Sequence, residues 1–345
     1  MKRSLLAPLG LLLLSPALIA QAPRATPPPG ATPSPAPSAP ASAEHHAAPA
    51  EDPFRLKPLA GNVYALYGRG GNVAFFVGPD AILVVDSQFK DLAPGIVAQI
   101  RKISDKPIRF LVNTHHHGDH VGGNEVFRQF AMIVAHDNVR ARMLASPVAI
   151  QKEYPAHLEE AKKSGNAEMV KFFSDQIAWA KTVKIEEIPA PVMTFDSALR
   201  IHIGEETIDV WHLPPAHTDG DSAVWFEKAK VLHMGDDFFN KVIPFVDVEG
   251  GGSVLGYLAA LDKAASKVPA DAVVIPGHGQ VSDLAGMKAF RQYFTDLMDA
   301  ARKARAAGKS KEDFVRDVDL DSYRSWNGYT ERFKANAASA WDEAK

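Results

Sequence analysis

The segment Thr114–His120, which reads Thr-His-His-His-Gly-Asp-His, constrains this chain more than any other feature of its sequence. It follows the apolar run 109–113, which predicts a strand, so the histidines lie on a loop at a strand end. Residues two apart in an extended stretch point to the same side, and His115 and His117 can therefore converge on one cation. Imidazole is a common zinc ligand. The segment predicts a metal site.

The same segment offers ligands for a second cation. Asp119 and His120 follow Gly118, where the backbone can turn, and a carboxylate with an imidazole completes a nitrogen and oxygen ligand set. With 13 histidines in 345 residues, such a pattern arises by chance in about one chain in a thousand. An exposed polar loop without function is therefore the weaker interpretation.

Three further candidate ligands stand beside small residues that let the backbone bend close to an ion. Each follows a predicted strand: His217 after 207–213, Asp236 after 230–234, and His278 after 272–275. Side chains held at strand ends by a rigid sheet suit a preorganised site. We therefore expect these residues to join the histidine cluster.

Other histidines and aromatic residues are predicted to have structural roles. His116 should point away from its neighbours, toward solvent or a supporting hydrogen bond. Four histidines on or near predicted strands are expected to be satisfied by local hydrogen bonds: His136, His202, His212 and His233. Three aromatic residues at helical spacing are expected in the core: Phe172, Phe173 and Trp179.

The order of predicted elements indicates an α/β fold built of two similar halves. Predicted strands are 62–67, 73–77, 81–85, 109–113, 132–135, 207–213, 222–226, 230–234 and 272–275. Predicted helices are 92–103, the charged stretch 137–181, 253–265 and most of the chain after 284. Strands and helices followed by strands and helices again favour two sheets packed face to face, with helices outside.

The beginning of the chain predicts export. Lys2 and Arg3 precede the apolar run 5–14, and small residues follow, so residues 1–22 are interpreted as a signal peptide cleaved after Ala20 or Ala22. The apolar run is too short for a mature transmembrane helix, and no stable membrane insertion is expected after cleavage. Residues 23–52, rich in proline and alanine, are predicted to be a disordered linker. The catalytic domain would span 53–345 with a helical C-terminal tail.

The charge and the cysteine content of the chain exclude several classes of function. The chain is 46% hydrophobic with a net charge of −3, and it has no run of like charges that would bind nucleic acid. It has no cysteine, which excludes disulfides, thiolate ligands and a cysteine nucleophile. We expect a secreted, periplasmic protein that acts on a small-molecule substrate, with no nucleic-acid partner.

The ordered set His-x-His-x-Asp-His, His, Gly-Asp and Gly-His-Gly resembles the metallo-β-lactamase superfamily, and 72–86 resembles the family's opening hairpin and strand. The resemblance covers about 60–280. It implies a four-layer αβ/βα sandwich with a dinuclear site at one edge. It also implies two zinc ions, with iron or manganese as alternatives.

The resemblance assigns roles to individual residues. The first metal would be held by His115, His117 and His217, and the second by Asp119, His120 and His278. Asp236 would bridge the two metals, and Asp86 would support the ligands from behind. A water shared by the two metals would be the nucleophile, and Asp119 would orient it as the catalytic residue.

The resemblance implies hydrolysis of a carbonyl-centred bond in a β-lactam-like amide, a lactone or an ester. The best-known β-lactamases of the family have cysteine at the position of Asp236 and a lysine shortly after it, whereas Lys241 does not match that spacing. A glyoxalase II-like thioesterase is one alternative. An iron-binding redox member is another, although no flavin or rubredoxin module is visible in the sequence.

Overall fold

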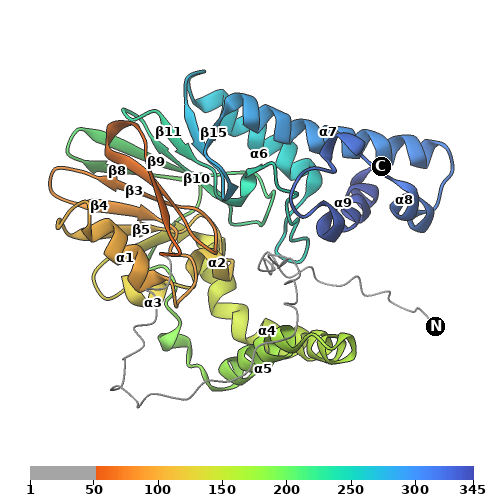
Figure 1. Cartoon of the computed structure of the whole chain (residues 1–345), viewed down its shortest axis with the longest axis horizontal. Coiled ribbons are helices and arrows are strands. Elements are labelled where there is room, and N and C mark those ends of the chain that lie inside the picture. The colour runs from red at the N-terminus through yellow and green to blue at the C-terminus, as the bar shows by residue number, and fades with distance from the viewer. Residues whose placement is uncertain (1–51) are drawn as a thin grey trace, which may run out of the picture.

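The computed structural model of the chain describes residues 52–345. The predicted signal peptide, and the predicted linker up to residue 51, lie outside the described residues. Two β-sheets pack face to face, and helices cover their outer surfaces (Figure 1). The four-layer αβ/βα sandwich expected from the sequence is confirmed.

The first sheet has the strand order β1-β2-β3-β4-β5-β6-β7. Its strands are β1 (Arg55–Pro58), β2 (Val63–Tyr67), β3 (Val73–Val77), β4 (Ile82–Val85), β5 (Ile108–Val112), β6 (Met132–His136) and β7 (Met193–Phe195). β1 to β4 are antiparallel neighbours, and the predicted hairpin is present with Leu66 opposite Val73. β4 to β7 are parallel, so their carboxyl ends meet at one edge of the sheet.

The second sheet has the strand order β15-β13-β11-β10-β9-β8. Its strands are β8 (Ala198–Ile203), β9 (Glu206–His212), β10 (Ser222–Phe226), β11 (Val231–His233), β13 (Val273–Ile275) and β15 (Ser282–Asp283). A separate short parallel pair joins β12 (Phe239–Asn240) to β14 (His278–Gly279). The edge strands β1, β7 and β15 are short and lack clear apolar alternation, so they were not predicted. The edge strand β8 was missed although its apolar residues alternate with polar ones.

Three apolar layers hold the sandwich together. The central layer lies between the sheets and includes Val85, Val112 and Phe226. A second layer packs the first sheet against α1 (Ala93–Arg101) and α3 (Asn124–Phe127). The third packs the second sheet against α6 (Val254–Lys267), α7 (Leu284–Ala306), α8 (Lys311–Asp317) and α9 (Tyr329–Glu343). Burying apolar surface in these layers fixes where the strand ends lie.

The charged stretch predicted to be helical forms two helices that pack on each other, α4 (Asp137–Ser164) and α5 (Ala167–Thr182). Gly165 ends α4 in a left-handed conformation with φ of 70°, which glycine adopts without strain. The pair projects below the sandwich in Figure 1. Phe173 is buried as expected, but Trp179 is 38% exposed, so the expectation that it lies in the core was wrong.

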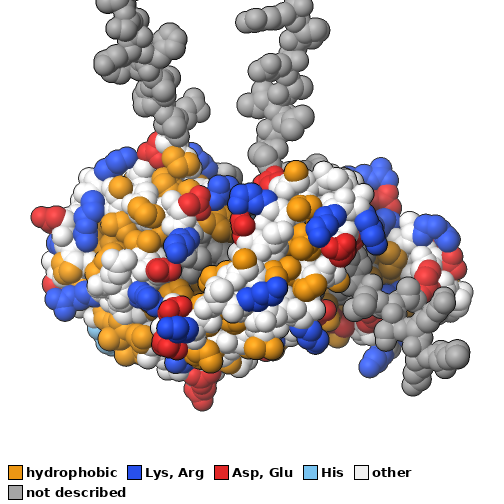
Figure 2. Space-filling model, turned by 90° about the horizontal axis from the view of Figure 1, so that it is seen from below, with side chains coloured by type: hydrophobic (Ala, Val, Ile, Leu, Met, Phe, Trp, Pro, Cys, Tyr) orange, Lys and Arg blue, Asp and Glu red, His pale blue; other side chains and the backbone are white. Residues whose placement is uncertain are grey.

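The surface mixes charges of both signs. Figure 2 shows lysine, arginine, aspartate and glutamate side chains interspersed with hydrophobic ones on the face seen from below. Among residues 52–345, no helix combines the length and the apolar character needed to cross a membrane.

Candidate metal centre

The predicted ligands all lie in segments that follow strands of the two sheets. His115, His117, Asp119 and His120 come after β5, the last two within the short helix α2 (Gly118–Val121). The others follow strands of the second sheet: His217 after β9, Asp236 after β11, and His278 after β13. The two sheets bring these loops together, so all seven side chains face one region.

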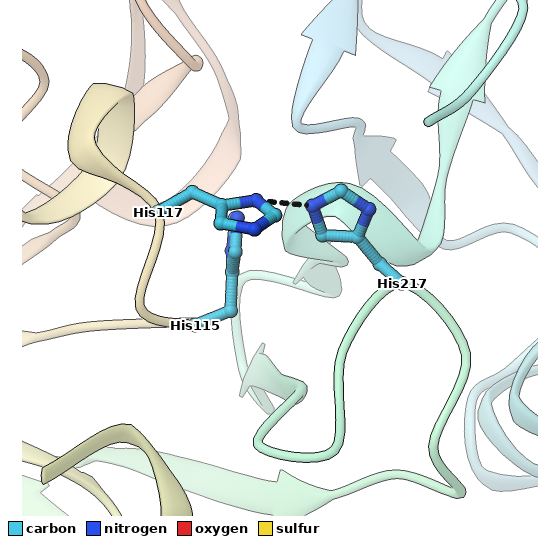
Figure 3. Close-up of side chains that lie close together, drawn as sticks. All are labelled: His115, His117 and His217. Atoms are coloured by element: carbon cyan, nitrogen blue, oxygen red, sulfur yellow. Dashed lines mark hydrogen bonds between the residues drawn. The ribbon is translucent and has the colours of Figure 1, made fainter. Parts of the chain in front are cut away.

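Three of the histidines form a first cluster. His115 and His117 come from the loop after β5, and His217 reaches them from the opposite sheet (Figure 3). Nε2 of His217 lies 2.8 Å from Nδ1 of His117. One ring nitrogen from each residue lies within 4.8 Å of the others. This spacing suits three ligands around one cation.

A second cluster consists of Asp119, His120 and His278, whose ligand atoms also lie within 4.8 Å of one another. Oδ2 of Asp119 is 3.2 Å from Nε2 of His278 and 3.7 Å from Nε2 of His120. The ring of His278 stacks on Phe239 at a centroid distance of 5.1 Å, which fixes its orientation. The structure thus groups these three residues as the sequence predicted.

Asp236 lies between the two clusters. Its carboxylate oxygens are 3.1 Å from Nε2 of His120, 3.3 Å from Nε2 of His217 and 3.4 Å from Nε2 of His278. It is also 3.9 Å from Nε2 of His115. A single buried carboxylate therefore reaches histidines of both clusters, which is the position that a bridging ligand needs.

Several ligand atoms are buried without a hydrogen bond. They are Nε2 of His115, His120 and His278, and both carboxylate oxygens of Asp236. Buried polar atoms are normally paired, because an unpaired one costs about 1–3 kcal/mol. Here the unpaired atoms converge on one another and form the donor set that zinc and similar cations prefer. The residues present fit a two-metal site.

Supporting hydrogen bonds fix which ring nitrogen faces the centre. Asp86 has a positive φ of 63° after β4, and its Oδ2 lies 2.7 Å from Nδ1 of His120. The same carboxylate accepts hydrogen bonds from the backbone N–H and hydroxyl of Thr114. Nδ1 of His217 lies 2.7 Å from the carbonyl oxygen of Phe245. Such partners orient ligating histidines and leave Nε2 for a metal.

Sequence reasoning missed Asp247, whose Oδ2 lies 2.9 Å from Nε2 of His117. The available signal was the run Gly250-Gly251-Gly252 that follows it. A Cβ on Gly250 would lie 2.1 Å from Oδ2 of Asp247, and the N–H of Gly250 donates to Oδ1 at 2.8 Å. Only glycine leaves room for this carboxylate to turn back toward the histidines.

Glycines also allow the backbone to approach the centre closely. A Cβ on Gly71 would lie 2.1 Å from the ring of His120, and a Cβ on Gly277 would lie 1.9 Å from Oδ1 of Asp236. Any side chain at either position would displace a predicted ligand. The glycines of the 68–71 turn and of the Gly-His-Gly segment are thus part of the site.

The site holds its carboxylates ionised. Burial alone would raise the pKa of Asp119, but the charges of His120 and His278 lower it to about 2. Burial lowers the pKa of His278, whereas the carboxylates of Asp236 and Asp119 raise it to about 9. Burial brings the pKa of His217 down to about 4 despite the charge of Asp236. The negative charges that would attract cations are therefore present at neutral pH.

Four of the remaining histidines take structural positions. His136, His212 and His233 lie within hydrogen-bond distance of backbone carbonyl oxygens. His202 is exposed on β8, and its Nδ1 lies 3.5 Å from the hydroxyl of Thr207 on the neighbouring strand. Nε2 of His116 is 3.9 Å from Oδ2 of Asp247, which is too far for a hydrogen bond, and its Nδ1 is buried without a partner. The supporting hydrogen bond expected for His116 is therefore not formed among residues 52–345.

Asp236 and Asp237 lie on a short helix that follows β11. The strand ends at His233, and Gly235, with a positive φ of 52°, starts the 3-10 helix Gly235–Asp237. The carboxyl of Asp237 is buried against Asp221. Burial and the charge of Asp221 raise the pKa of Asp237 well above its usual value.

Helix α9 holds the loop that supports His217. Asn336 donates a hydrogen bond to the carbonyl oxygen of Pro244 at 3.0 Å, and Nη1 of Arg332 donates to that of Ile243 at 3.0 Å. At the other end of α9, the carboxylate of Glu343 accepts from the backbone N–H groups of Val254 and Leu255 at the start of α6. Hydrogen bonds from α9 therefore hold the loop 243–254 near both of its ends.

Comparison with known proteins places this site in a family. The family model described as "Metallo-beta-lactamase superfamily" matches residues 66–278, which contain all seven predicted ligands. The chain belongs to the metallo-beta-lactamase superfamily. The family assignment made from the histidine and aspartate pattern is therefore confirmed.

Two proteins illustrate the similarity of the chain at the level of sequence. A linear primary-alkylsulfatase from Pseudomonas sp. (strain ATCC 19151) is 27% identical over 222 residues, which are 59% of this chain and 40% of that protein. An uncharacterized protein from Aquifex aeolicus (strain VF5) is 23% identical over 233 residues, which are 65% of this chain and 96% of that protein. The chain spans less than half the length of the alkylsulfatase.

Solved structures of the superfamily have the same fold. A metallo-beta-lactamase from Pontibacter korlensis superposes with a TM-score of 0.52 at 16% identity, covering 70% of this chain and 99% of that one. A stereoselective inverting sec-alkylsulfatase from Pseudomonas sp. gives a TM-score of 0.61 at 14% identity, covering 84% of this chain and 50% of that one. At these identities the likeness concerns the fold alone.

Proposed function

We propose that this protein is an exported hydrolase with two zinc ions, which cleaves a carbonyl-centred bond in a small molecule. The observation that carries the proposal is the position of Asp236, whose carboxylate lies within 4 Å of histidines from both clusters. A mononuclear site would not need a buried carboxylate shared by two ligand sets. Export rests on the signal-peptide pattern of residues 1–22.

The metal ions and the side chains of the protein would have different roles in the proposed hydrolysis. When bound, the metal ions supply a water of lowered pKa and an electrophile for the substrate oxygen. Asp119 is held ionised, and its side chain is 9% exposed at the edge of the centre. It is therefore placed to orient a nucleophilic water and to accept its proton. Asp86, Phe245 and Asp247 keep the histidine rings in their ligating orientation.

The carbonyl substrates to be tested are β-lactam-like amides, lactones and esters, with thioesters as the glyoxalase II-like alternative. A second candidate function is hydrolysis of a sulfate ester. It is favoured by the similarity to a linear primary-alkylsulfatase and by the fold shared with a sec-alkylsulfatase. An iron-loaded redox function is the other alternative, and it would use the same ligands.

The proposal predicts close to two metal ions per chain after zinc reconstitution. Six side chains are available as terminal ligands, and Asp236 is available as a bridge. Elemental analysis measures the stoichiometry, and a screen of lactams, lactones, esters, thioesters and alkyl sulfates measures the activity. No more than a trace of metal in the reconstituted protein would contradict the proposal. Hydrolysis of alkyl sulfates alone would select the second candidate.

A further inference from the structure

Tyr257 lies behind the candidate metal centre and contacts two of its predicted ligands. It is on α6, and its side chain is fully buried. Its hydroxyl donates a hydrogen bond to the backbone carbonyl oxygen of Asp236 at 3.0 Å. The same hydroxyl oxygen lies 3.3 Å from Nδ1 of His217 and 3.2 Å from the carbonyl oxygen of Phe245. One hydroxyl therefore meets the bridging ligand, a ligand of the first cluster and the group that orients that ligand.

The three partners of this hydroxyl come from separate segments of the chain. His217 follows β9, Asp236 follows β11, and Phe245 lies on the loop 243–254. With Nε2 of His217 facing the centre, its Nδ1 carries the proton and donates to the carbonyl of Phe245 at 2.7 Å. Among residues 52–345, Tyr257 is the only hydrogen-bond donor to the carbonyl oxygen of Asp236. The hydroxyl therefore links the backbone of Asp236 to the ring of His217.

Aromatic packing and the close approach of α6 fix where the hydroxyl lies. The ring of Tyr257 stacks on Phe294 of α7 with a centroid distance of 4.3 Å. A Cβ on Gly256 would lie 1.6 Å from the carbonyl oxygen of Pro215, so only glycine lets α6 come this close to the segment that precedes His217. Because a close-packed interior allows a buried ring little movement, the hydroxyl stays against both ligands.

We propose that Tyr257 is a positioning residue, whose hydroxyl sets the place of the bridging carboxylate relative to the first cluster. A carboxylate oxygen of Asp236 lies 3.3 Å from Nε2 of His217, and Tyr257 holds the backbone of the one and the ring of the other from behind. Without the hydroxyl, both ligands could shift. Removing such a supporting group typically lowers metal affinity or activity about 10- to 100-fold. This inference rests on the metal centre of the proposed function and not on which bond is cleaved.

The first test is Tyr257→Phe in the full chain loaded with cobalt(II), whose visible absorption depends on the number and the geometry of its ligands. Phenylalanine keeps the ring that stacks on Phe294 and removes only the hydroxyl. We expect altered cobalt absorption bands, and about tenfold weaker cobalt binding in competition with a chelator. A spectrum and an affinity equal to those of the original protein would overturn the inference, and so would a variant that does not fold.

Tyr323→Phe is the matched control. Tyr323 is also buried, and its hydroxyl donates to Oδ2 of Asp296 at 2.6 Å and to no predicted ligand in the part of the chain that the structure describes. Both variants lose a buried hydrogen bond, so both should lower the melting temperature of the metal-free protein. Tyr323→Phe should keep the original cobalt spectrum and an affinity within about twofold. Equal changes of cobalt binding in the two variants would show that both act through stability, and would overturn the inference.

Kinetics separate the positioning of metal ligands from contact with the substrate. On a substrate that the zinc-loaded protein hydrolyses, Tyr257→Phe should lower kcat about tenfold and leave KM within about twofold, because the buried hydroxyl lies behind the ligands. A raised KM at unchanged kcat would contradict the inference. If the original protein, fully loaded with zinc, cleaves no substrate of the screen, the hydrolytic proposal fails, while the cobalt spectra still decide the role of Tyr257.

Discussion

Asp236 contacts four histidines although it contributes only one carboxylate. Replacing it by alanine would remove the negative charge that balances both cations. We expect Asp236→Ala to lose one of the two metals and to reduce turnover at least about a hundredfold, the scale of losing a metal-centred electrostatic effect. Metal stoichiometry and kcat measured on the same preparation test this.

The control for this variant is Asp237→Asn. An alanine at Asp237 would leave a cavity against Asp221, whereas asparagine keeps the volume and the hydrogen-bonding capacity. The Asp237→Asn protein should retain both metals. If it loses metal while Asp236→Ala keeps two, the bridging position has been assigned to the wrong residue.

The pair Asp221 and Asp237 also predicts a pH dependence of stability. Burial raises the pKa of Asp221 from its usual 3.8 to about 6. A carboxyl whose pKa is raised on folding favours the folded state at low pH, and this stability is lost as the pH rises from about 4 through 6.

Asp237→Asn removes one of the two titrating carboxyls and its repulsion of Asp221, so less stability should be lost over that range. We expect its melting temperature in the metal-free protein to exceed the original by about 2–4 °C at pH 7, and by less at pH 4. Thermal unfolding at the two pH values measures the difference. An equal shift at both values would show that the charge of Asp237 does not destabilise the fold.

Single residues also show how far the sequence could predict the site. The predicted ligands could be found because each is a histidine or aspartate placed directly after a strand. Asp247 could not be found this way, because it reaches His117 through the tertiary packing of a loop far along the chain.

At the level of elements, apolar alternation predicted the buried strands well. β2, β3 and β10 occur within a residue of the predicted bounds, because their burial requires the pattern. The edge strand β7 lies partly in solvent and is too short to show a pattern, whereas β8 was overlooked although its apolar and polar residues alternate. The packing of α9 against the loop 243–254 depends on hydrogen bonds between segments far apart in sequence, and no local pattern predicts those.

Helix α9 should stabilise the first metal cluster through Asn336. This side chain is 1% exposed and donates to the carbonyl of Pro244 and to the hydroxyl of Tyr293, both at 3.0 Å. Asn336→Leu keeps the approximate size and leaves these acceptors unpaired, at a cost of about 1–3 kcal/mol. We expect lower stability and faster loss of metal to a chelator, because the neighbouring Phe245 carbonyl orients His217.

Ser339→Ala is the control on the same helix. Its hydroxyl donates only to the carbonyl of Ala335 within α9 and is exposed. Unfolding curves and chelator titrations for the two variants should therefore differ. Equal behaviour of the two proteins would show that α9 does not support the loop.

At the scale of the whole molecule, the described structure begins just before the first strand. Asp52 accepts hydrogen bonds from the N–H of Phe54 and from Gln99, the latter at 2.6 Å, and Phe54 packs against α1. Deleting residues 1–51 should therefore leave activity and melting temperature unchanged, whereas a deletion that extends through Phe54 should destabilise the protein. If deletion of 1–51 abolishes hydrolysis, the predicted linker has more than a spacer role.

The hydrogen bonds between α9 and the loop 243–254 predict how truncating mutations will affect the protein. During synthesis the ribosome completes every predicted ligand, through His278, before it makes Asn336 and Glu343. A premature stop codon in the last part of the reading frame would leave all the ligand codons intact and remove the helix that holds the loop. Nonsense alleles far from the histidine motif should therefore be as inactive as missense alleles within it.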